Sequence, residues 1–324
     1  MSHDLRPAPM MLDAATVRTQ LTVADCLPLI RPAMIALSDG TAKQLLRSFI
    51  PMGEARTFAL MPAALSERGY FGAKVISVFA DPDNPGRRAH DGMIVLFEGE
   101  RGRIVCIADA GEITGIRTAA ASAAATDALA RKDAGVLTIM GSGLQARTHL
   151  EAMQLVRPLR EVRLWTRSRA SGEAFAKDAA SISKLPVRVF NDAQTAVAGA
   201  DIICTVTSAS EPILKGAWVS PGAHVNVVGS SAPVPAEIDN DLVVRARFFA
   251  DHKPHVLAHG AEFLRAKAAG LIGDDHILAE IGEVYADAKP GRLSDHDVTI
   301  YKSLGHAVQD LAAVSWLYER SCKN

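Results

Sequence analysis

The spacing of apolar residues changes along the chain and predicts two differently built regions. In the first third, apolar runs of strand length are separated by polar turn formers, and a helical pattern with Thr22 as its N-cap precedes them at 22–37. We expect strands over 56–61, 70–79, 92–97 and 104–108. A polar loop at 81–88 and a hairpin turn at 98–102 join them, so the pattern predicts an antiparallel sheet flanked by helix.

From residue 134 onward, strand-like and helix-like segments alternate. An alanine-rich stretch over 113–131 favours helix and is predicted to connect the two regions. We expect strands over 136–140, 162–165, 187–190, 202–206, 224–228, 247–250 and 298–302. We expect helices over 171–181 (with Ser171 as cap), 263–269, 277–288 and 307–320. This alternation predicts an α/β fold class, with a parallel sheet and right-handed crossovers.

The turn after the first of these strands is the most informative stretch. The strand runs into a Gly-x-Gly-x-x-Ala sequence. In the Rossmann form of this motif the first glycine turns the chain, the second lets backbone approach a pyrophosphate, and the third small residue lets helix pack on strand. The helix N-terminus offers free N–H groups to the phosphates. We therefore predict dinucleotide binding, rather than an ordinary turn, at Gly141, Gly143, Leu144, Gln145 and Ala146.

The end of the next strand bears on which dinucleotide is bound. NAD-specific proteins usually carry an acid there that bonds the ribose 2′-hydroxyl. Here the strand ends in Thr166, Arg167, Ser168 and Arg169, with no acid. Guanidinium groups suit a phosphate by their bidentate geometry, so this stretch favours NADPH, with NADH possible. The alternative is that both arginines are solvated loop charges.

Composition narrows the classes of partner. The chain has 324 residues, 48% of them apolar and 22% charged, with a net charge of −1, so we expect no nucleic-acid and no membrane partner. No apolar run approaches a membrane span, and no signal-peptide core is present near the start. The four cysteines (Cys26, Cys106, Cys204 and Cys322) are scattered. We interpret them as buried free thiols, which is typical of a reducing, cytoplasmic location.

Several short motifs converge on one family. Lys74 follows Phe71-Gly72-Ala73, Arg117 stands in Gly115-Ile116-Arg117-Thr118-Ala119-Ala120, and the glycine loop follows in order. Together with the stretches at 60–63, 226–229 and 301–305, they resemble the ornithine cyclodeaminase/mu-crystallin family over nearly the whole chain. The resemblance implies a homodimer and a Rossmann doubly wound parallel sheet inserted in an α+β domain. On this basis, 132–301 would form the cofactor domain. Residues 1–131 with 302–324 would form the substrate and dimerisation domain.

The resemblance also implies roles for individual residues. Lys74 and Arg117 would be catalytic and, with Arg47, would hold a substrate carboxylate, which agrees with the need for fixed cations beside a reacting carbon. The alternative for each is a surface charge. Asp310 is a further candidate for contact with substrate or cofactor, or a solvated helix acid. The additional cofactor-binding candidates lie on the connecting helix or at strand ends: Thr118, Thr207, Val228 and Gly229.

Two departures from the cyclodeaminase pattern point to a branch of the family. Cyclodeaminases carry an aspartate where this chain has Ser231, and a glutamate where it has Ala59. Oxidative deamination must first deprotonate an ammonium group, which needs a positioned base, whereas reduction of a ready-made imine does not. The serine motif is similar to that of ketimine reductases and bacterial pyrroline-2-carboxylate reductases. Ser231 is therefore a substrate-binding candidate, or only a turn hydroxyl.

We therefore expect an NAD(P)H-dependent reductase of small cyclic imino acids, with Δ1-pyrroline-2-carboxylate going to L-proline as the leading reaction. Two alternatives stay open: an ornithine cyclodeaminase or related amino-acid dehydrogenase, and a non-catalytic NADPH-dependent binder of a small ligand. His252, His255 and His259 have a spacing that could offer metal ligands, although Pro254 should start a helix that leaves His252 outside. The family implies no metal, so we expect none.

Overall fold

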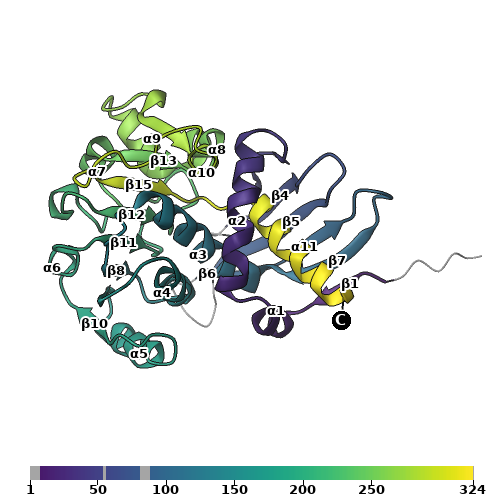
Figure 1. Ribbon diagram of the computed structural model, residues 1–324, viewed down its shortest axis with the longest axis horizontal. Coiled ribbons are helices and arrows are strands. Elements are labelled where there is room, and N and C mark those ends of the chain that lie inside the picture. The colour runs from purple at the N-terminus through teal and green to yellow at the C-terminus, as the bar shows by residue number, and fades with distance from the viewer. Residues whose placement is uncertain (1–7, 54–55, 81–87, 324) are drawn as a thin grey trace, which may run out of the picture.

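The computed structural model describes residues 8–53, 56–80 and 88–323 and arranges them around two sheets (Figure 1). The first is seven-stranded, in the order β1-β7-β6-β5-β4-β2, with β3 also paired to β4. Its strands are β1 (Met10–Leu12), β2 (Lys43–Gln44), β3 (Ser48–Pro51), β4 (Thr57–Ala64), β5 (Phe71–Ala80), β6 (Arg88–Phe97) and β7 (Ile104–Asp109). All of these pairs are antiparallel except the parallel pair β1–β7, which confirms the predicted antiparallel sheet. Most of the predicted polar loop, 81–87, lies outside the described residues.

Helices from both ends of the chain pack at this sheet: α1 (Ala14–Gln20), α2 (Val23–Ser38) and α11 (Ala307–Lys323). α11 lies on β4 to β7 and α1 on β1 and β7, while α2 packs on α11. Thr22 caps α2 as expected, in a capping box with Asp25. In Figure 1 the yellow α11 crosses the strands beside the purple α2, so the last residues of the chain complete the unit that the first residues begin. Among the described helices none is by itself long and apolar enough to span a membrane, and only the bent pair α1–α2 passes that test jointly.

The alanine-rich segment forms α3 (Ala110–Leu129), which lies between the two sheets (Figure 1). It packs on α2 and α11 on one side and on α4 (Leu144–Val156) on the other. Most of its residues are buried, because small side chains let neighbouring helices approach closely on every face. The predicted connector is therefore a helix that belongs to the core of both regions.

The second sheet has eight strands, all parallel, in the order β10-β9-β8-β11-β12-β15-β13-β14. The strands are β8 (Val136–Met140), β9 (Glu161–Trp165), β10 (Val187–Phe190), β11 (Ile202–Thr205), β12 (His224–Val227), β13 (Arg247–Ala250), β14 (Ile277–Glu280) and β15 (Thr299–Lys302). The chain winds outward from β8 in one direction and then returns to place β11 on its other side. This confirms a doubly wound sheet, with its topological switch point between β8 and β11.

The connections in this sheet carry the remaining elements. The helices are α5 (Arg169–Ala179), α6 (Ala193–Val197), α7 (Asn240–Arg245), α8 (Lys253–His259), α9 (Ala261–Ala268) and α10 (Ile281–Tyr285), with short 3₁₀ turns at Gly216–Trp218 and Asp274–His276. His252 is the N-cap of α8 and lies outside it, as Pro254 predicted.

Three sequence-based expectations are wrong. The expected helix at 277–288 begins as strand β14, because Ile277 and Ala279 are buried alternately against β13, and α10 starts only at Ile281. The cap of α5 is Ser168, whose hydroxyl accepts from the amide of Ser171 and so starts the helix earlier. Cys322 is exposed in the last turn of α11, whereas the other three cysteines are buried free thiols as expected.

Candidate active site

The glycine loop connects β8 to α4 at the switch point of the parallel sheet. Gly141 has φ +125°, and a Cβ atom there would lie 2.7 Å from the carbonyl oxygen of Val206, so a side chain is excluded twice over. A Cβ on Gly143 would meet nothing within 4 Å. The second glycine therefore leaves open space next to the backbone, which is the feature that a pyrophosphate requires.

The first turn of α4 follows directly from this open space. Gly143 is the N-cap, and no side chain of the described residues caps the helix. The amide groups of Leu144 and Gln145 are therefore available to an anion at the positive end of the helix dipole. Ala146 is fully buried against the sheet, which confirms the predicted close packing of helix on strand. The residues present thus fit a dinucleotide phosphate by backbone geometry alone.

The end of β9 contains the residues that we expect to discriminate between cofactors. The hydroxyl of Thr166 lies 3.3 Å from that of Ser142 in the glycine loop, so the two turns are adjacent. Arg167 is exposed, and no hydrogen bond or ion pair of its side chain is present among the described residues. Arg169, in contrast, is the first residue of α5, and its Nε donates to Glu173 at 2.7 Å. The two predicted phosphate ligands therefore differ in their freedom to move.

Glu237 is buried and holds the segments that follow β11 and β12, although its place in the sequence predicted no role for it. Glu237 accepts hydrogen bonds from the amide and hydroxyl of Thr207 (both 2.7 Å), from Gly229 N (2.7 Å) and from the hydroxyl of Thr205 (2.8 Å). It thereby fixes two predicted cofactor-binding positions, while the third, Val228, is half-buried beside them. Burial raises the pKa of Glu237. In the sequence, Glu237 is only an acidic residue shortly after a glycine turn, and this pattern is too common to predict a role for it.

The N-terminal half of α3 brings the substrate side to the glycine loop. A Cβ on Gly115 would lie 3.2 Å from the side chain of Leu144, so the two helices touch at this point. Thr114 joins the two sides, because its hydroxyl accepts from Lys74 Nζ while its carbonyl accepts from Gln145 Nε2 at 3.5 Å. Thr118, one turn further along, is buried at the same helix–helix contact.

Lys74 and Arg117 share one carboxylate in the interior of the protein. Asp310 Oδ1 accepts from Arg117 Nε at 2.9 Å and lies 3.4 Å from Lys74 Nζ, and all three side chains are almost completely buried. Gln309 accepts from Arg117 Nη1 at 2.9 Å. Burial, reinforced by the neighbouring arginine and opposed by Asp310, lowers the pKa of Lys74 to about 8. Lys74 is thus an ammonium group that can exchange its proton close to neutral pH.

Arg47 reaches the same region from the segment between β2 and β3. Its Nη2 donates to the carbonyls of Leu304 (2.6 Å) and Gly305 (2.8 Å), and its Nη1 donates to the carbonyl of Ser231 at 3.3 Å. Burial lowers the pKa of Arg47 to about 10, which still leaves it charged at neutral pH. Gly305 in turn packs on the other cation, since a Cβ there would lie 2.5 Å from Arg117 Nη1.

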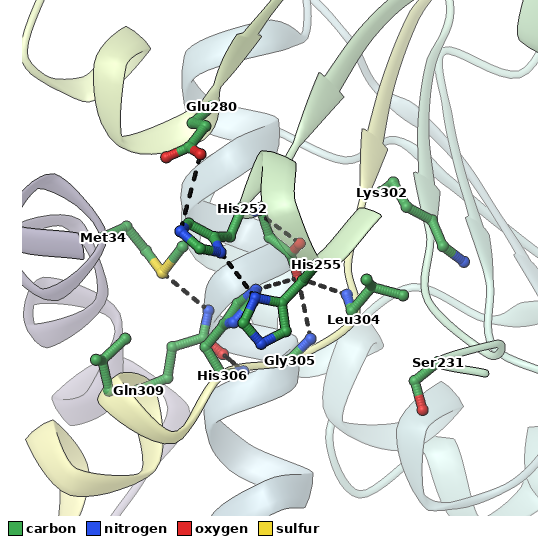
Figure 2. Close-up of polar contacts among 12 residues, drawn as sticks. Met34, Ser231, His252, His255, Glu280, Lys302, Leu304, Gly305, His306 and Gln309 are labelled. Atoms are coloured by element: carbon green, nitrogen blue, oxygen red, sulfur yellow. Dashed lines mark hydrogen bonds and ion pairs between the residues drawn. The ribbon is translucent and has the colours of Figure 1, made fainter. Parts of the chain in front are cut away.

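The two positions that separate the branches of the family lie on this side of the site. Ala59 is buried on β4, on the same face of the sheet as Met61, which is paired with Lys74. Ser231 is half-buried, and in Figure 2 it lies to one side of the histidines and of Leu304. Its backbone carbonyl, rather than its hydroxyl, contacts Arg47. Neither position supplies a carboxylate.

The charges of this cluster make it a site for an anion. Lys74, Arg117 and Arg47 are three cations, and Asp310 is the one carboxylate that hydrogen-bonds within the cluster among the residues described. Buried charges of one sign need compensation from the opposite sign. An α-carboxylate entering beside the glycine loop would supply that compensation and would be oriented by the guanidinium plane.

Comparison with known proteins places the chain in a family. The model of the ornithine cyclodeaminase/mu-crystallin family matches residues 8–324. The chain belongs to this family. Ketimine reductase mu-crystallin of Mus musculus is 37% identical over 320 residues, which are 97% of this chain and 98% of the relative.

Solved structures agree over the same length. The Δ1-pyrroline-2-carboxylate reductase of Thermococcus litoralis, solved with NADH and L-proline, has a TM-score of 0.92 at 28% identity, covering 97% of this chain and 98% of that one. An archaeal alanine dehydrogenase dimer with bound NAD has a TM-score of 0.91 at 28% identity, covering 97% and 96%. Together with the glycine loop, these likenesses identify the chain as a nicotinamide-dependent oxidoreductase.

Proposed function

We propose that the protein is an NADPH-dependent reductase of small cyclic ketimines, and that Δ1-pyrroline-2-carboxylate is reduced to L-proline as its main reaction. The observation that carries the proposal is the buried pair Lys74–Arg117 beside the glycine loop, in a site without a carboxylate at positions 59 and 231. Such a site attracts and orients the carboxylate of an imino acid, but it offers no base at the two positions where cyclodeaminases have one.

The roles of the residues follow from their contacts. A reduced nicotinamide, when bound, supplies the hydride for the imine carbon. Arg117, held in plane by Asp310 and Gln309, orients the substrate carboxylate, while Arg47, held by the carbonyls of Leu304 and Gly305, adds positive charge. Lys74, with its pKa lowered to about 8, holds a proton beside the substrate and is our candidate for protonating the imine nitrogen. Thr114 fixes the ammonium group towards the cofactor loop.

A substrate panel tests this proposal directly. Five- and six-membered cyclic imino acids should each oxidise NADPH in the presence of the protein, whereas L-ornithine with NAD⁺ should release little ammonia. The matched variants are Ser231→Ala and Ser231→Asp. The first should retain reductase activity, and the second should impair it by placing a negative charge near the substrate carboxylate. Robust ammonia release without any ketimine turnover would overturn the proposal in favour of a cyclodeaminase.

We also propose that the protein acts as a homodimer through the outer face of the first sheet. Large apolar side chains are exposed there in neighbouring strands, which is the usual sign of a protein interface. They include Ile50, Phe58, Leu60, Phe71 and Met93. Leu60→Glu should yield a monomer in sedimentation experiments, whereas Leu155→Glu, on the distant helix α4, should leave the dimer intact.

A cytoplasmic location is part of the same proposal, supported by the free thiols.

A further inference from the structure

Three histidines meet next to the substrate side, in a cluster that the proposed reaction does not use. His252 and His255 lie at the start of α8, and His306 lies in the turn before α11. One ring nitrogen of each lies within 4.8 Å of one in each of the others, and Figure 2 shows the rings gathered between Glu280 and the Leu304–Gly305 segment. His259, which the sequence spacing grouped with the first two, instead contacts the ring of Phe49.

The orientation of His306 is fixed from outside the cluster. Its Nε2 lies 2.9 Å from Asp251 Oδ2, which also accepts from the amides of Leu304 and Gly305 (2.5 and 3.0 Å). Although burial raises the pKa of Asp251, His306 and these amides hold it well below its ordinary value. The carboxylate therefore directs His306 Nδ1 into the cluster. Proteins orient the histidine ligands of metal ions by this kind of carboxylate contact.

One ring nitrogen of His255 and one of His306 already face the same group, the side-chain amide of Gln44. The side-chain oxygen of Gln44 accepts from Val308 N at 3.1 Å, which turns its NH₂ group inward. That nitrogen lies 2.9 Å from His306 Nδ1 and 3.3 Å from His255 Nε2. Both imidazole nitrogens thus act as acceptors towards a shared donor. A cation that replaced the amide would meet two nitrogen ligands without any change of their tautomers.

His252 completes the set. Its Nδ1 lies 2.7 Å from His255 Nδ1, and its Nε2 lies 3.9 Å from Glu280, so a second carboxylate stands behind the ring. His255 and His306 are buried and His252 is half-buried, so the cluster is shielded from bulk water. The positive charge of Arg47 would disfavour a cation at this position. It acts on His255 only at longer range, and its guanidinium group donates to backbone carbonyls.

We propose that His252, His255 and His306 bind a divalent metal ion such as Zn²⁺, with water as the fourth ligand. Nitrogen ligands at about 2.0–2.1 Å from a tetrahedral zinc ion lie roughly 3.3 Å from one another, and one ring nitrogen of each histidine already lies within 4.8 Å of the others. Ring rotations and displacement of the Gln44 amide would complete the site. Because Asp251 also holds Leu304 and Gly305, the ion would brace the segment that contacts Arg47 and Arg117.

The test uses the full chain without a histidine tag, stripped with a chelator and then titrated with Zn²⁺ or Co²⁺. We expect one ion per chain by equilibrium dialysis with elemental analysis, and the visible absorption of Co²⁺ in a tetrahedral nitrogen site. His255→Ala and His306→Ala should weaken binding by at least about 100-fold, beyond the 10–100-fold typical of losing an orienting partner. His259→Ala, on the same helix as His255 but outside the cluster, should bind as the unmodified protein does.

The result that overturns the proposal is an unmodified chain that takes up no stoichiometric ion, which would leave the histidines as a hydrogen-bonded network only. Equal binding by His255→Ala, or loss of binding in His259→Ala, would overturn it as well. If His306→Ala does not fold, as judged by circular dichroism, His252→Ala replaces it, because this ring lies nearer the surface. Metal binding is measured without substrate, so the outcome does not depend on the proposed reaction.

Discussion

The two sides of the active site are built by opposite means. The cofactor side uses backbone amides and small residues within six consecutive positions, Gly141 to Ala146, and its key feature is open space. The substrate side uses charged side chains from β5, α3 and α11, with Lys74 and Asp310 separated by 236 positions, and its key feature is burial. A site made of backbone groups can be predicted from a short sequence motif. A site made of buried charges forms only when folding brings distant residues together.

The largest effect should come from the buried side. Arg117→Lys keeps the charge but loses the planar fork that bonds Asp310 and Gln309 and orients a carboxylate. We expect kcat/KM for the ketimine to fall by about 100-fold or more, since misplacement of a reacting group has effects of this size. NADPH binding, followed by fluorescence, should persist. Full activity in Arg117→Ala would show that both sides of the site can act without this clamp.

On the cofactor side, the two arginines after β9 can be separated. Arg167 is exposed and Arg169 is paired with Glu173, so Arg167→Ala should weaken NADPH more than Arg169→Ala. A lost bond to a charged phosphate is worth about 1.5–3 kcal/mol, or roughly 10- to 100-fold in affinity. Affinity for NADH should change little in either variant. Equal losses for NADH and NADPH would mean that neither arginine recognises the 2′-phosphate.

The glycine loop itself offers a matched pair. Gly141→Ala forces a side chain into a left-handed conformation and against Val206, so the protein should lose about 1–3 kcal/mol of unfolding free energy in urea denaturation. Gly143→Ala meets no neighbouring atom and should fold normally, but its methyl group should obstruct the pyrophosphate and weaken cofactor binding. If Gly143→Ala binds NADPH as well as the unmodified protein does, the open space has another purpose.

The smallest effect concerns the proton on Lys74. Its ammonium form is present below a pKa of about 8 and is lost as the pH rises, so kcat/KM should decline above pH 8, by about tenfold per pH unit at most. Thr114→Val removes an acceptor of the ammonium group and should move this decline to lower pH. A profile that stays flat well above pH 8 would remove the proton of Lys74 from the reaction.

The sequence predicted those features of the structure that depend on residues close together in the chain, and it missed features that depend on distant contacts. The parallel sheet, the capping of α2 by Thr22 and the glycine turn follow from residues close together in the chain, and the structure confirms them. The doubly wound order, also confirmed, was implied by the family resemblance. Strand β14 could not be foreseen, because its pairing with β13 overrides a helical pattern.

The substrate side was predictable only in part, for the same reason. Lys74 and Arg117 were named from a resemblance, but no spacing rule joins them to Asp310 or shows that one carboxylate serves both. The local sequence around Glu237 and His306 was too common in kind to single either residue out. Their importance comes from the positions to which the fold brings Thr207, Gly229 and the other histidines.

The place of β15 in the parallel sheet has a consequence for synthesis. This strand, Thr299–Lys302, lies between β12 and β13, so β13 and β14 join the rest of the sheet only through it. The first sheet likewise lacks the helix that packs across β4 to β7 until α11 has been synthesised. Neither half of the molecule can therefore reach its final form before residues 299–323 have been synthesised, although large proteins usually fold domain by domain from the N-terminus. Both sheets depend on residues 299–323, and a chain released before this segment would have both halves unfinished.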